Sequence, residues 1–389
     1  MKKVAVLTMI LGYTMIVYGQ RLSPEKIKPM SHDTLIKYMQ QTMHDFAIPG
    51  IAVSIFTGDK ILNEQVSGLR KLNTNDSIKI SDRFYLGSCG KAMTGFVAGR
   101  LVEKGLIKWD TKVLDVFPEF KDSSNLTYLN ITLNDVLSHR ARVKSFNYSF
   151  ECDTLRSFHG INTKTRRYDF IKWLLKQSPV EIDSVKKYTY SDAGYAVAAS
   201  MMEKITGKAW NDLIADELFN PLNMTVTIGW PALYDKNQPW GHKVLDGDSI
   251  LIPQIPNIKD YQDYDDEILA PAGDYAMSII DYTKFLQLNL SGLNGKDSIL
   301  KTATFNYLHY CNFDYQVPLF TYYSIGWAAF KTKGGLTVSK HDGSDETFYC
   351  CTTLFKEVNL GVTITANSGD KNAMIGLHTL KDRIVKYYR

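Results

Sequence analysis

The feature that most constrains the fold is the placement of strand-like segments at both ends of the chain, with helical segments between them. Ile51–Phe56 and Ile61–Val66, separated by a short polar turn, predict a β-hairpin. Further strands are predicted near the C-terminal end, at Tyr323–Phe330, Leu336–Lys340, Thr347–Phe355 and Leu360–Ala366. We therefore expect one antiparallel sheet assembled from both chain ends.

Helical periodicity marks the segments that surround this sheet. The predicted helices are a segment beginning at Ser31, Leu133–His139, Ala193–Thr206, Asp281–Leu290 and a final one carrying Met374 to Tyr388. These elements predict an α+β fold, an α/β sandwich in which helices flank the sheet. We expect residues 88–290, roughly, to form a largely helical subdomain that is inserted in the sheet subdomain. A site is expected in a cleft between the two subdomains.

Composition narrows the class of protein. Of the 389 residues, 44% are hydrophobic and 12% aromatic, which is ordinary for a globular chain with a substantial core. The formal charge of +4 comes from 45 basic and 41 acidic residues, without a long basic block. Nucleic-acid binding is therefore not expected.

The first residues have the pattern of a secretory signal. Lys2 and Lys3 precede an apolar run from Val4 to Tyr18, and Gly19 follows. We expect residues 1–19 to be a signal peptide, residues 20–389 to form one domain, and the protein to be periplasmic or secreted. A retained membrane anchor is the alternative, but the run is short for a span, so no stable membrane span is expected after cleavage.

The five cysteines do not form a metal-binding pattern. Cys89, Cys152, Cys311, Cys350 and Cys351 show no C-x-x-C spacing, so no metal site is expected. Cys350 and Cys351 are adjacent in a predicted strand and should point to opposite faces of the sheet.

Ser88 and Lys91 are the first candidates for chemistry. Apolar residues recur at helical spacing after Ser88, which places Ser88 in the first turn of a helix. Residues three apart share a helix face, so the Lys91 amine can act as base for the Ser88 hydroxyl. The alternative is a capping serine and a solvated lysine. Cys89 is an alternative nucleophile, but it lacks a lysine at this spacing, and a packing role is favoured.

Two later segments carry further candidates. Tyr190 and Asp192 stand immediately before and at the start of a predicted helix. A phenol whose pKa is lowered by a nearby lysine can serve as general base and acid, although a core tyrosine and a capping aspartate are the alternatives. His341 and Gly343 end a predicted strand, where a backbone N–H can help form an oxyanion hole and glycine allows close approach of a substrate. His341 can donate to a substrate carboxylate or serve only a structural purpose.

The order of these segments resembles a known superfamily. S-x-x-K after a hairpin, Y-S-D-x-G-Y about a hundred residues later, and H-x-G near the C-terminus resemble serine β-lactamases and penicillin-binding proteins. The similarity is to the class C-related branch, with D-aminopeptidases, DD-peptidases and esterases. Framework segments also match in order, among them Ile48–Val53, Leu101–Gly105, Val136–His139, Asn220–Met224 and Pro271–Gly273.

The resemblance implies roles for these residues. Ser88 would be the acylated nucleophile, Lys91 its base and Tyr190 the proton relay, while the N–H groups of Ser88 and Ser344 would form the oxyanion hole. Asp192, His341, Gly343 and Ser344 would contact the substrate, a small molecule or peptide. No cofactor is required.

Several positions depart from the family pattern. Asp192 stands in place of Asn, a change that holds Lys91 charged, and His341 stands in place of Lys. Asp345 and Glu346 add negative charge, so we expect the site to bind the carboxylate of a β-lactam less well. Arg140 and Arg142 occupy the family's H-T-S-G segment and are candidates for contacting an anionic substrate group, with solvent exposure as the alternative.

The sequence therefore predicts an exported serine hydrolase that cleaves an amide or ester through a Ser88 acyl-enzyme and is not an efficient β-lactamase. One alternative is a DD-peptidase or D-aminopeptidase acting on cell-wall peptides. Another is a penicillin-binding or sensor protein that does not turn over its ligand.

Overall fold

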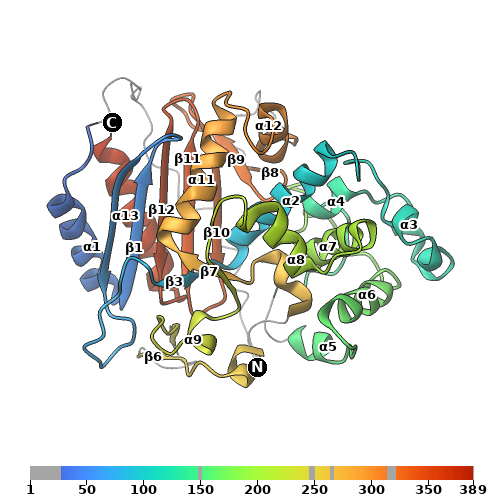
Figure 1. The fold of residues 1–389 in the computed structure, drawn as a ribbon, viewed down its shortest axis with the longest axis horizontal. Helices are drawn as coiled ribbons and strands as arrows, with labels where there is room; N and C mark the ends of the chain where they lie inside the picture. The colour runs from blue at the N-terminus through green and yellow to red at the C-terminus, as the bar shows by residue number, and fades with distance from the viewer. Residues whose placement is uncertain (1–27, 148–150, 245–249, 263–266, 313–320, 389) are drawn as a thin grey trace.

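A seven-stranded antiparallel sheet forms the centre of the computed structural model, which describes residues 28–147, 151–244, 250–262, 267–312 and 321–388. The strand order is β2-β1-β12-β11-β10-β9-β8 (Figure 1). The strands are β1 Gly50–Phe56, β2 Ile61–Gly68, β8 Tyr322–Tyr323, β9 Ala328–Lys331, β10 Thr337–Ser344, β11 Tyr349–Phe355 and β12 Leu360–Ala366. The register of β1 on β12, with Ile51 opposite Ala366, confirms that both chain ends build one sheet. The predicted signal peptide lies outside the described residues.

The predicted strand Tyr323–Phe330 is interrupted. A tight turn separates β8 from β9, closed by a hydrogen bond from Ser324 N to Trp327 O of 2.9 Å. Gly326 has a φ of 75°, and a Cβ there would lie 2.5 Å from Ala92 Cα. The chain turns here because its backbone meets a helix. β10 includes His341 and Gly343 near its end, as predicted.

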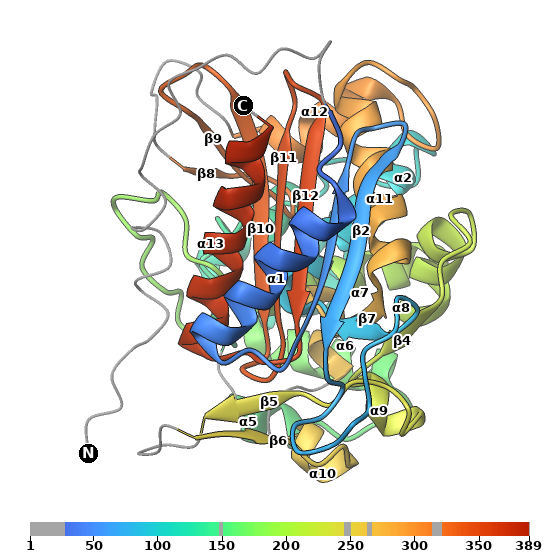
Figure 2. The ribbon, with the colours of Figure 1, turned by 90° about the vertical axis from the view of Figure 1, so that its left-hand side faces the viewer.

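Two helices from opposite ends of the sequence cover one face of the sheet (Figure 2). They are α1, His32–Phe46, and α13, Lys371–Tyr387. Ser31 caps α1 as predicted, because its side chain accepts from Thr34 N. Cys351 lies in the core beneath these helices and Cys350 in the core on the other face, which confirms that the adjacent cysteines point to opposite sides.

The other face of the sheet carries α2, Lys91–Glu103, α11, Ile279–Leu293, and α12, Thr302–Tyr310, with the helical part beyond them (Figure 1). That part contains α3 Val113–Val116, α4 Leu133–Leu137, α5 Cys152–Arg156, α6 Thr163–Leu174, α7 Asp192–Thr206 and α8 Trp210–Ile214. Two further short helices, α9 Pro231–Tyr234 and α10 Ile258–Gln262, lie at the bottom of the molecule in Figure 2. Short 3₁₀ turns are η3 Gly87–Gly90, η4 Pro118–Ser123, η5 Leu126–Tyr128 and η8 Glu267–Ala272, and η7 Ala215–Phe219 is a π-helical turn.

Two small sheets were not predicted from the sequence. One pairs β3 Arg83–Tyr85 with β7 Tyr275–Ser278 and β7 with β4 Val226–Ile228, and the other pairs β5 His242–Val244 with β6 Leu251–Pro253. These strands are three or four residues long, which is too short for a clear alternating pattern. The first sheet matters for function, because β3 leads directly into η3.

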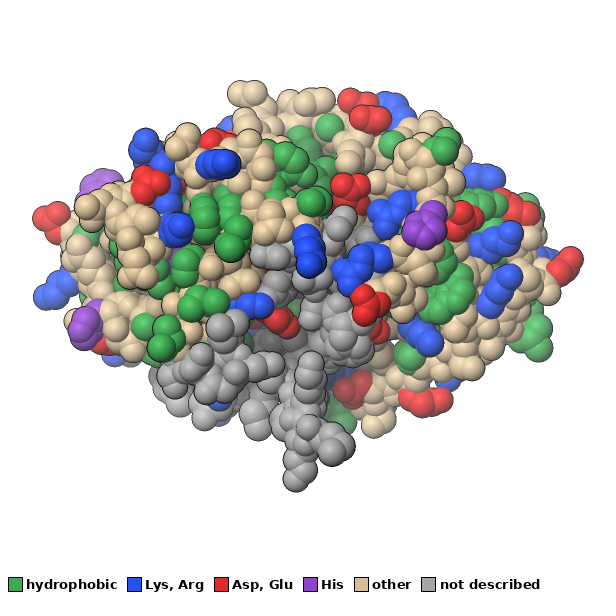
Figure 3. Space-filling view, turned by 90° about the horizontal axis from the view of Figure 1, so that it is seen from below, with side chains coloured by type: hydrophobic (Ala, Val, Ile, Leu, Met, Phe, Trp, Pro, Cys, Tyr) green, Lys and Arg blue, Asp and Glu red, His purple; other side chains and the backbone are tan. Residues whose placement is uncertain are grey.

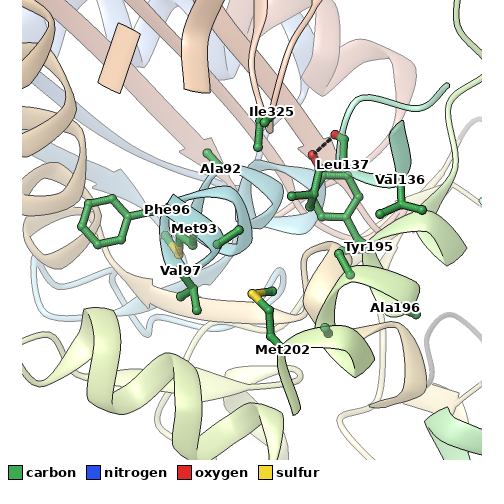
Figure 4. Packing of buried hydrophobic residues seen from close by; sticks show 14 of the residues in the cluster. Ala92, Met93, Phe96, Val97, Val136, Leu137, Tyr195, Ala196, Met202 and Ile325 are labelled. Carbon is green, nitrogen blue, oxygen red and sulfur yellow. Dashed lines mark hydrogen bonds between the residues drawn. The ribbon is translucent and has the colours of Figure 1, made fainter. Parts of the chain in front are cut away.

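Helix α2 lies between the sheet and α7. Figure 4 shows Met93 and Val97 of α2 beside Met202 of α7, all of them buried. Tyr195 of α7 donates a hydrogen bond of 2.8 Å to the carbonyl of Leu137. Because α2 is enclosed by packed side chains, the residues at its N-terminal end have fixed positions.

A buried arginine attaches η8 to the helical part. Arg167 of α6 pairs with Glu203 of α7 at 2.7 Å and donates to the carbonyls of Glu267 and Ile268, both at 2.8 Å. A buried guanidinium is stable only when its donors are satisfied. This arrangement therefore fixes η8, whose last residue, Ala272, enters the site.

The described surface is mixed in charge. Lys and Arg side chains are interspersed with Asp and Glu on the face seen from below (Figure 3). Within the described residues, every helix is too short or too polar to cross a membrane.

Candidate active site

Ser88 lies in the 3₁₀ turn η3, immediately before α2. The turn follows β3, and Leu86 N donates to Tyr275 O at 2.9 Å, which links it to β7. Gly87 has a φ of 51°, and a Cβ there would lie 2.5 Å from Ser344 N. Only glycine allows the turn to lie this close to the end of β10, and Ser88 itself remains partly exposed.

Lys91 is the first residue of α2 and is fully buried. Its Nζ lies 3.1 Å from Ser88 Oγ, as the spacing predicted. It also donates to the carbonyl of Ala272 at 2.9 Å and lies 2.5 Å from Asp192 Oδ1. An ammonium group has three N–H donors, so these three acceptors match its charged form.

Asp192 contacts Lys91 because another residue caps α7. Ser191 is the N-cap, and its Oγ accepts from Gly194 N at 3.1 Å. The capping alternative for Asp192 is therefore wrong, and its carboxylate is available to Lys91. Burial raises the pKa of Asp192, while the Lys91 ammonium acts in the opposite direction.

Tyr190 is held in place by backbone contacts on both sides. Its neighbours donate to His139: Thr189 N to the carbonyl at 3.0 Å and Ser191 N to the ring Nδ1 at 3.1 Å. Asn147 Nδ2 donates to the Tyr190 carbonyl at 3.0 Å. The centroid of the Tyr190 ring then lies 4.8 Å from Lys91 Nζ, and its hydroxyl is hydrogen-bonded to Ser88. The structure thus brings Ser88, Lys91 and Tyr190 together.

The protonation of Tyr190 differs from the sequence prediction. Burial, and then the negative charge of Asp192, raise the pKa of Tyr190 well above its ordinary value, although the hydrogen bond to Ser88 acts in the opposite direction. The expectation of a lowered pKa is wrong because burial disfavours the phenolate and the negative charge of Asp192 acts in the same direction. Tyr190 is therefore a protonated phenol at neutral pH.

The end of β10 lies against η3. A Cβ on Gly343 would be 2.7 Å from the backbone nitrogen of Ser88, so the two backbones are in direct contact. This contact brings the N–H groups of Ser88 and Ser344 into one region. The Ser344 side chain is used locally, since its Oγ donates to the Phe348 carbonyl at 2.7 Å.

His341 lies beside this region as a neutral ring. Its Nδ1 donates to the carbonyl of Asp342 at 2.7 Å, because a carbonyl can only accept. Burial, and then the charge of Lys91, lower the pKa of His341 to about 4. In this arrangement the ring offers no N–H to a substrate carboxylate. Of the two alternatives from the sequence, donation to a substrate carboxylate is therefore not supported.

Three charged residues expected near the substrate have other partners. Arg140 donates to the carbonyls of Ser138 and Tyr323, at 3.0 and 3.1 Å. Arg142 pairs with Glu181 at 3.3 Å. Asp345 accepts from the backbone of residues 347 and 348 and so organises the turn between β10 and β11. The expectation that Asp345 and Glu346 disfavour a β-lactam carboxylate stays a prediction.

The sequence alone did not assign three residues that build the site. His139 and Asn147 hold the Tyr190 loop, and Tyr323 donates to His341 Nε2 at 3.0 Å. His139 belongs to Val136–His139, a segment that matches the superfamily, and this match was the one sequence feature that could have indicated its role. Asn147 and Tyr323 carried none, because their contacts join segments that are distant in the sequence.

Comparison with known proteins gives the family. The Beta-lactamase family model matches residues 35–383. A curated relative, "Penicillin-binding protein 4" of Amycolatopsis lactamdurans, is 29% identical over 184 residues, 47% of this chain and 45% of the relative. The matches span 36% to 61% of the length of the first curated relatives.

Two solved structures share the fold. A penicillin-binding protein homologue from Pyrococcus abyssi has a TM-score of 0.70 at 19% identity, covering 91% of this chain and 78% of that one. A class C beta-lactamase from Rhodobacter sphaeroides has a TM-score of 0.67 at 16% identity, covering 90% of this chain and 99% of that one. Family pattern and fold agree, and the chain belongs to the beta-lactamase family, within the superfamily of serine β-lactamases and penicillin-binding proteins.

Proposed function

We propose that this protein is a serine hydrolase that cleaves an amide or ester through a covalent acyl-enzyme on Ser88. The observation that carries the proposal is the position of the Ser88 hydroxyl, 3.1 Å from Lys91 Nζ and hydrogen-bonded to the Tyr190 phenol. A hydroxyl between an amine and a phenol has both a base to remove its proton and an acid to return one.

Acylation begins from a resting site in which Lys91 and Tyr190 both carry their protons. Lys91 first loses one proton to solvent and becomes a base. Ser88 Oγ then attacks the substrate carbonyl carbon, and the Ser88 proton passes to Lys91 Nζ. The N–H groups of Ser88 and Ser344 donate to the oxyanion that forms.

Collapse of the tetrahedral intermediate breaks the bond to the leaving group. Tyr190 gives its phenolic proton to the leaving amine or alcohol and takes a proton from Lys91. Water then attacks the Ser88 ester, with Lys91 accepting the proton of the water, and the acid is released as Ser88 regains a proton. No cofactor takes part in these steps.

The substrate is a small molecule or peptide, and an efficient β-lactamase is not proposed. Asp192 replaces an amide donor with an acceptor that is already occupied by Lys91. A DD-peptidase or D-aminopeptidase acting on cell-wall peptides is the second candidate, favoured by the similarity to "Penicillin-binding protein 4".

Export is part of the same proposal. The basic start and apolar run of residues 1–19 support cleavage of a signal peptide and a periplasmic or secreted location. We expect the intact mass of the protein from a native extracytoplasmic fraction to correspond to a chain that begins at Gln20. A mature protein that retains residues 1–19 would contradict export by signal cleavage.

The nucleophile is tested by Ser88→Ala. We expect a fluorophosphonate to form one adduct with the wild-type protein, and neither adduct nor turnover of p-nitrophenyl acetate with Ser88→Ala, because the attacking oxygen is absent. Intact mass measures the adduct, and release of p-nitrophenol measures turnover.

Cys89→Ala is the matched control. Cys89 is fully buried, and burial raises the pKa of its thiol well above the ordinary value, so it is a poor nucleophile. This variant should keep the adduct. An adduct that survives Ser88→Ala would refute the assignment of Ser88.

The acid is tested by Tyr190→Phe. The variant keeps the ring beside Lys91 and removes only the hydroxyl, so we expect kcat to fall by about a hundredfold to ten-thousandfold with an unchanged melting temperature. Tyr188→Phe, which removes a buried hydroxyl two residues away, should retain wild-type kcat. Equal values of kcat for the two variants would exclude Tyr190 from proton transfer.

The Lys91–Asp192 pair predicts a pH dependence. The Asp192 carboxylate favours the charged form of Lys91, and Lys91 must be neutral to act as base, so kcat/KM should rise with pH. In Asp192→Asn this favourable charge is absent, and we expect the acidic limb of the profile to move to lower pH by about one unit.

Glu181→Gln removes a carboxylate that pairs with Arg142 and serves as the control, with a wild-type profile expected. An acidic limb that stays in place or moves to higher pH in Asp192→Asn would show that Asp192 does not oppose deprotonation of the base.

A further inference from the structure

Both ring nitrogens of His341 are occupied by groups of the protein. Nδ1 carries the proton and donates to the Asp342 carbonyl at 2.7 Å. In a neutral ring the other nitrogen is then an acceptor, and Nε2 lies 3.0 Å from the Tyr323 hydroxyl. Tyr323 therefore donates to His341. Burial raises the pKa of Tyr323 well above its ordinary value, so the phenol keeps the proton that it donates.

Tyr323 is held in position independently of His341. The residue is buried, and its ring centroid lies 4.3 Å from that of His139 and 5.5 Å from that of Tyr188. Its carbonyl accepts from Arg140 at 3.1 Å and from Asn312 at 3.2 Å. The hydroxyl of Tyr323 is thus a fixed donor.

The charged groups around His341 are already engaged. Lys91 is paired with Asp192 at 2.5 Å. Lys340 lies 3.8 Å from Asp342, and alternation along β10 directs both away from the face that carries His341. The titratable and charged groups that face His341 or influence its charge are Lys91, Cys89, His139, Tyr190, Tyr323, Lys340 and Asp342. Among these described groups, each cation has an anionic partner.

His341 lies near the place that the leaving group occupies in the proposed mechanism. The ring centroids of His341 and Tyr190 are 6.4 Å apart. Because Tyr190 protonates the leaving group in the proposed mechanism, the leaving group lies on the Tyr190 side of Ser88. His341 is one of the rings there, beside His139 and Tyr323, whose centroids lie 4.2 and 5.9 Å from that of Tyr190. An anionic substituent there meets a neutral ring without a free donor.

We propose that Tyr323 is a specificity-determining positioning residue: its hydroxyl holds His341 neutral and occupied, so the site favours amides and esters whose leaving group carries no carboxylate. The inference rests on the proposed hydrolase function and names its substrate class. A carboxylate brought to this point loses solvation without gaining a partner, which lowers kcat/KM.

A matched pair of aryl esters tests this preference. 3-Acetoxybenzoate and 3-acetoxybenzamide differ in one substituent of the leaving phenol, which is a carboxylate in the first and a neutral carboxamide of similar shape in the second. We expect wild-type kcat/KM, corrected for the uncatalysed rate of each ester, to favour the benzamide by about tenfold or more from pH 5.5 to pH 8. Because the two kcat/KM values are measured on one enzyme, their ratio cancels the pH dependence of acylation that both esters share.

Tyr323→Phe should change this ratio only at low pH. A hydrogen bond to the neutral form of a ring opposes its protonation, so removing the donor raises the pKa of His341. At pH 5.5 the cationic ring then donates to the carboxylate, and the benzamide preference should fall about fivefold or more, whereas at pH 8 it should remain. Tyr188→Phe removes a hydroxyl from the same aromatic cluster and should keep the wild-type ratio at both pH values.

A second variant keeps the test decisive if Tyr323→Phe does not fold. His341→Lys places a cation at this position, and the benzoate should gain about tenfold relative to the benzamide at pH 8. Equal wild-type activity on both esters, or a wild-type ratio for Tyr323→Phe at pH 5.5 or for His341→Lys at pH 8, would overturn the inference. Fluorophosphonate labelling separates these results from failure of the proposed function: absence of both a Ser88 adduct and turnover of either ester would refute the hydrolase and, with it, this specificity.

Discussion

The buried ammonium of Lys91 is the constraint on which the rest of the structure depends. A buried charge is tolerated only when its donors are satisfied, and the three acceptors come from three separate elements. Ser88 Oγ belongs to η3, the Ala272 carbonyl ends η8, and the Asp192 carboxylate begins α7. The turn before α2, the end of η8 and the start of α7 must therefore meet at one point. The buried Arg167 of α6, which holds η8 by its carbonyls, extends the same requirement into the helical part.

Strand β10 joins two different environments because side chains alternate along it. His341 and Gly343 face the turn that carries Ser88. Asp342 faces α13, where burial raises its pKa but the charges of His378 and Lys340 act more strongly and lower it well below the ordinary value. A shift of one residue in the register of β10 would place the carboxylate of Asp342 in the site. The pairing of His341 with Thr352 on β11 is therefore a condition for the neutral site as well as for the sheet.

Local patterns predicted the parts of the structure that local physics decides. Alternation and helical spacing gave the terminal strands and α7, and the spacing of Ser88 and Lys91 gave their contact. The break between β8 and β9 was missed because it depends on the approach of Gly326 to α2, a tertiary contact. Tyr323 was missed for the same reason. The predicted direction of the Tyr190 pKa was wrong although the residues around it had been named, because the shift depends first on burial, a property of the tertiary structure, and then on the charge of Asp192.

The site carries little net charge, and this determines how it can stabilise an oxyanion. Lys91 is balanced by Asp192, and His341 and Tyr190 are neutral, so these side chains supply no net positive charge to the reacting atoms. Stabilisation in the proposed mechanism must come from the backbone dipoles of Ser88 and Ser344, which are effective when they are fixed before the reaction. Glycine at positions 87 and 343 allows the two backbones to lie in direct contact, and in the proposed mechanism the N–H groups of Ser88 and Ser344 then donate to one oxygen. A Cβ at either position would separate η3 from β10, so the two glycines belong to the electrostatics of the site although neither has a side chain.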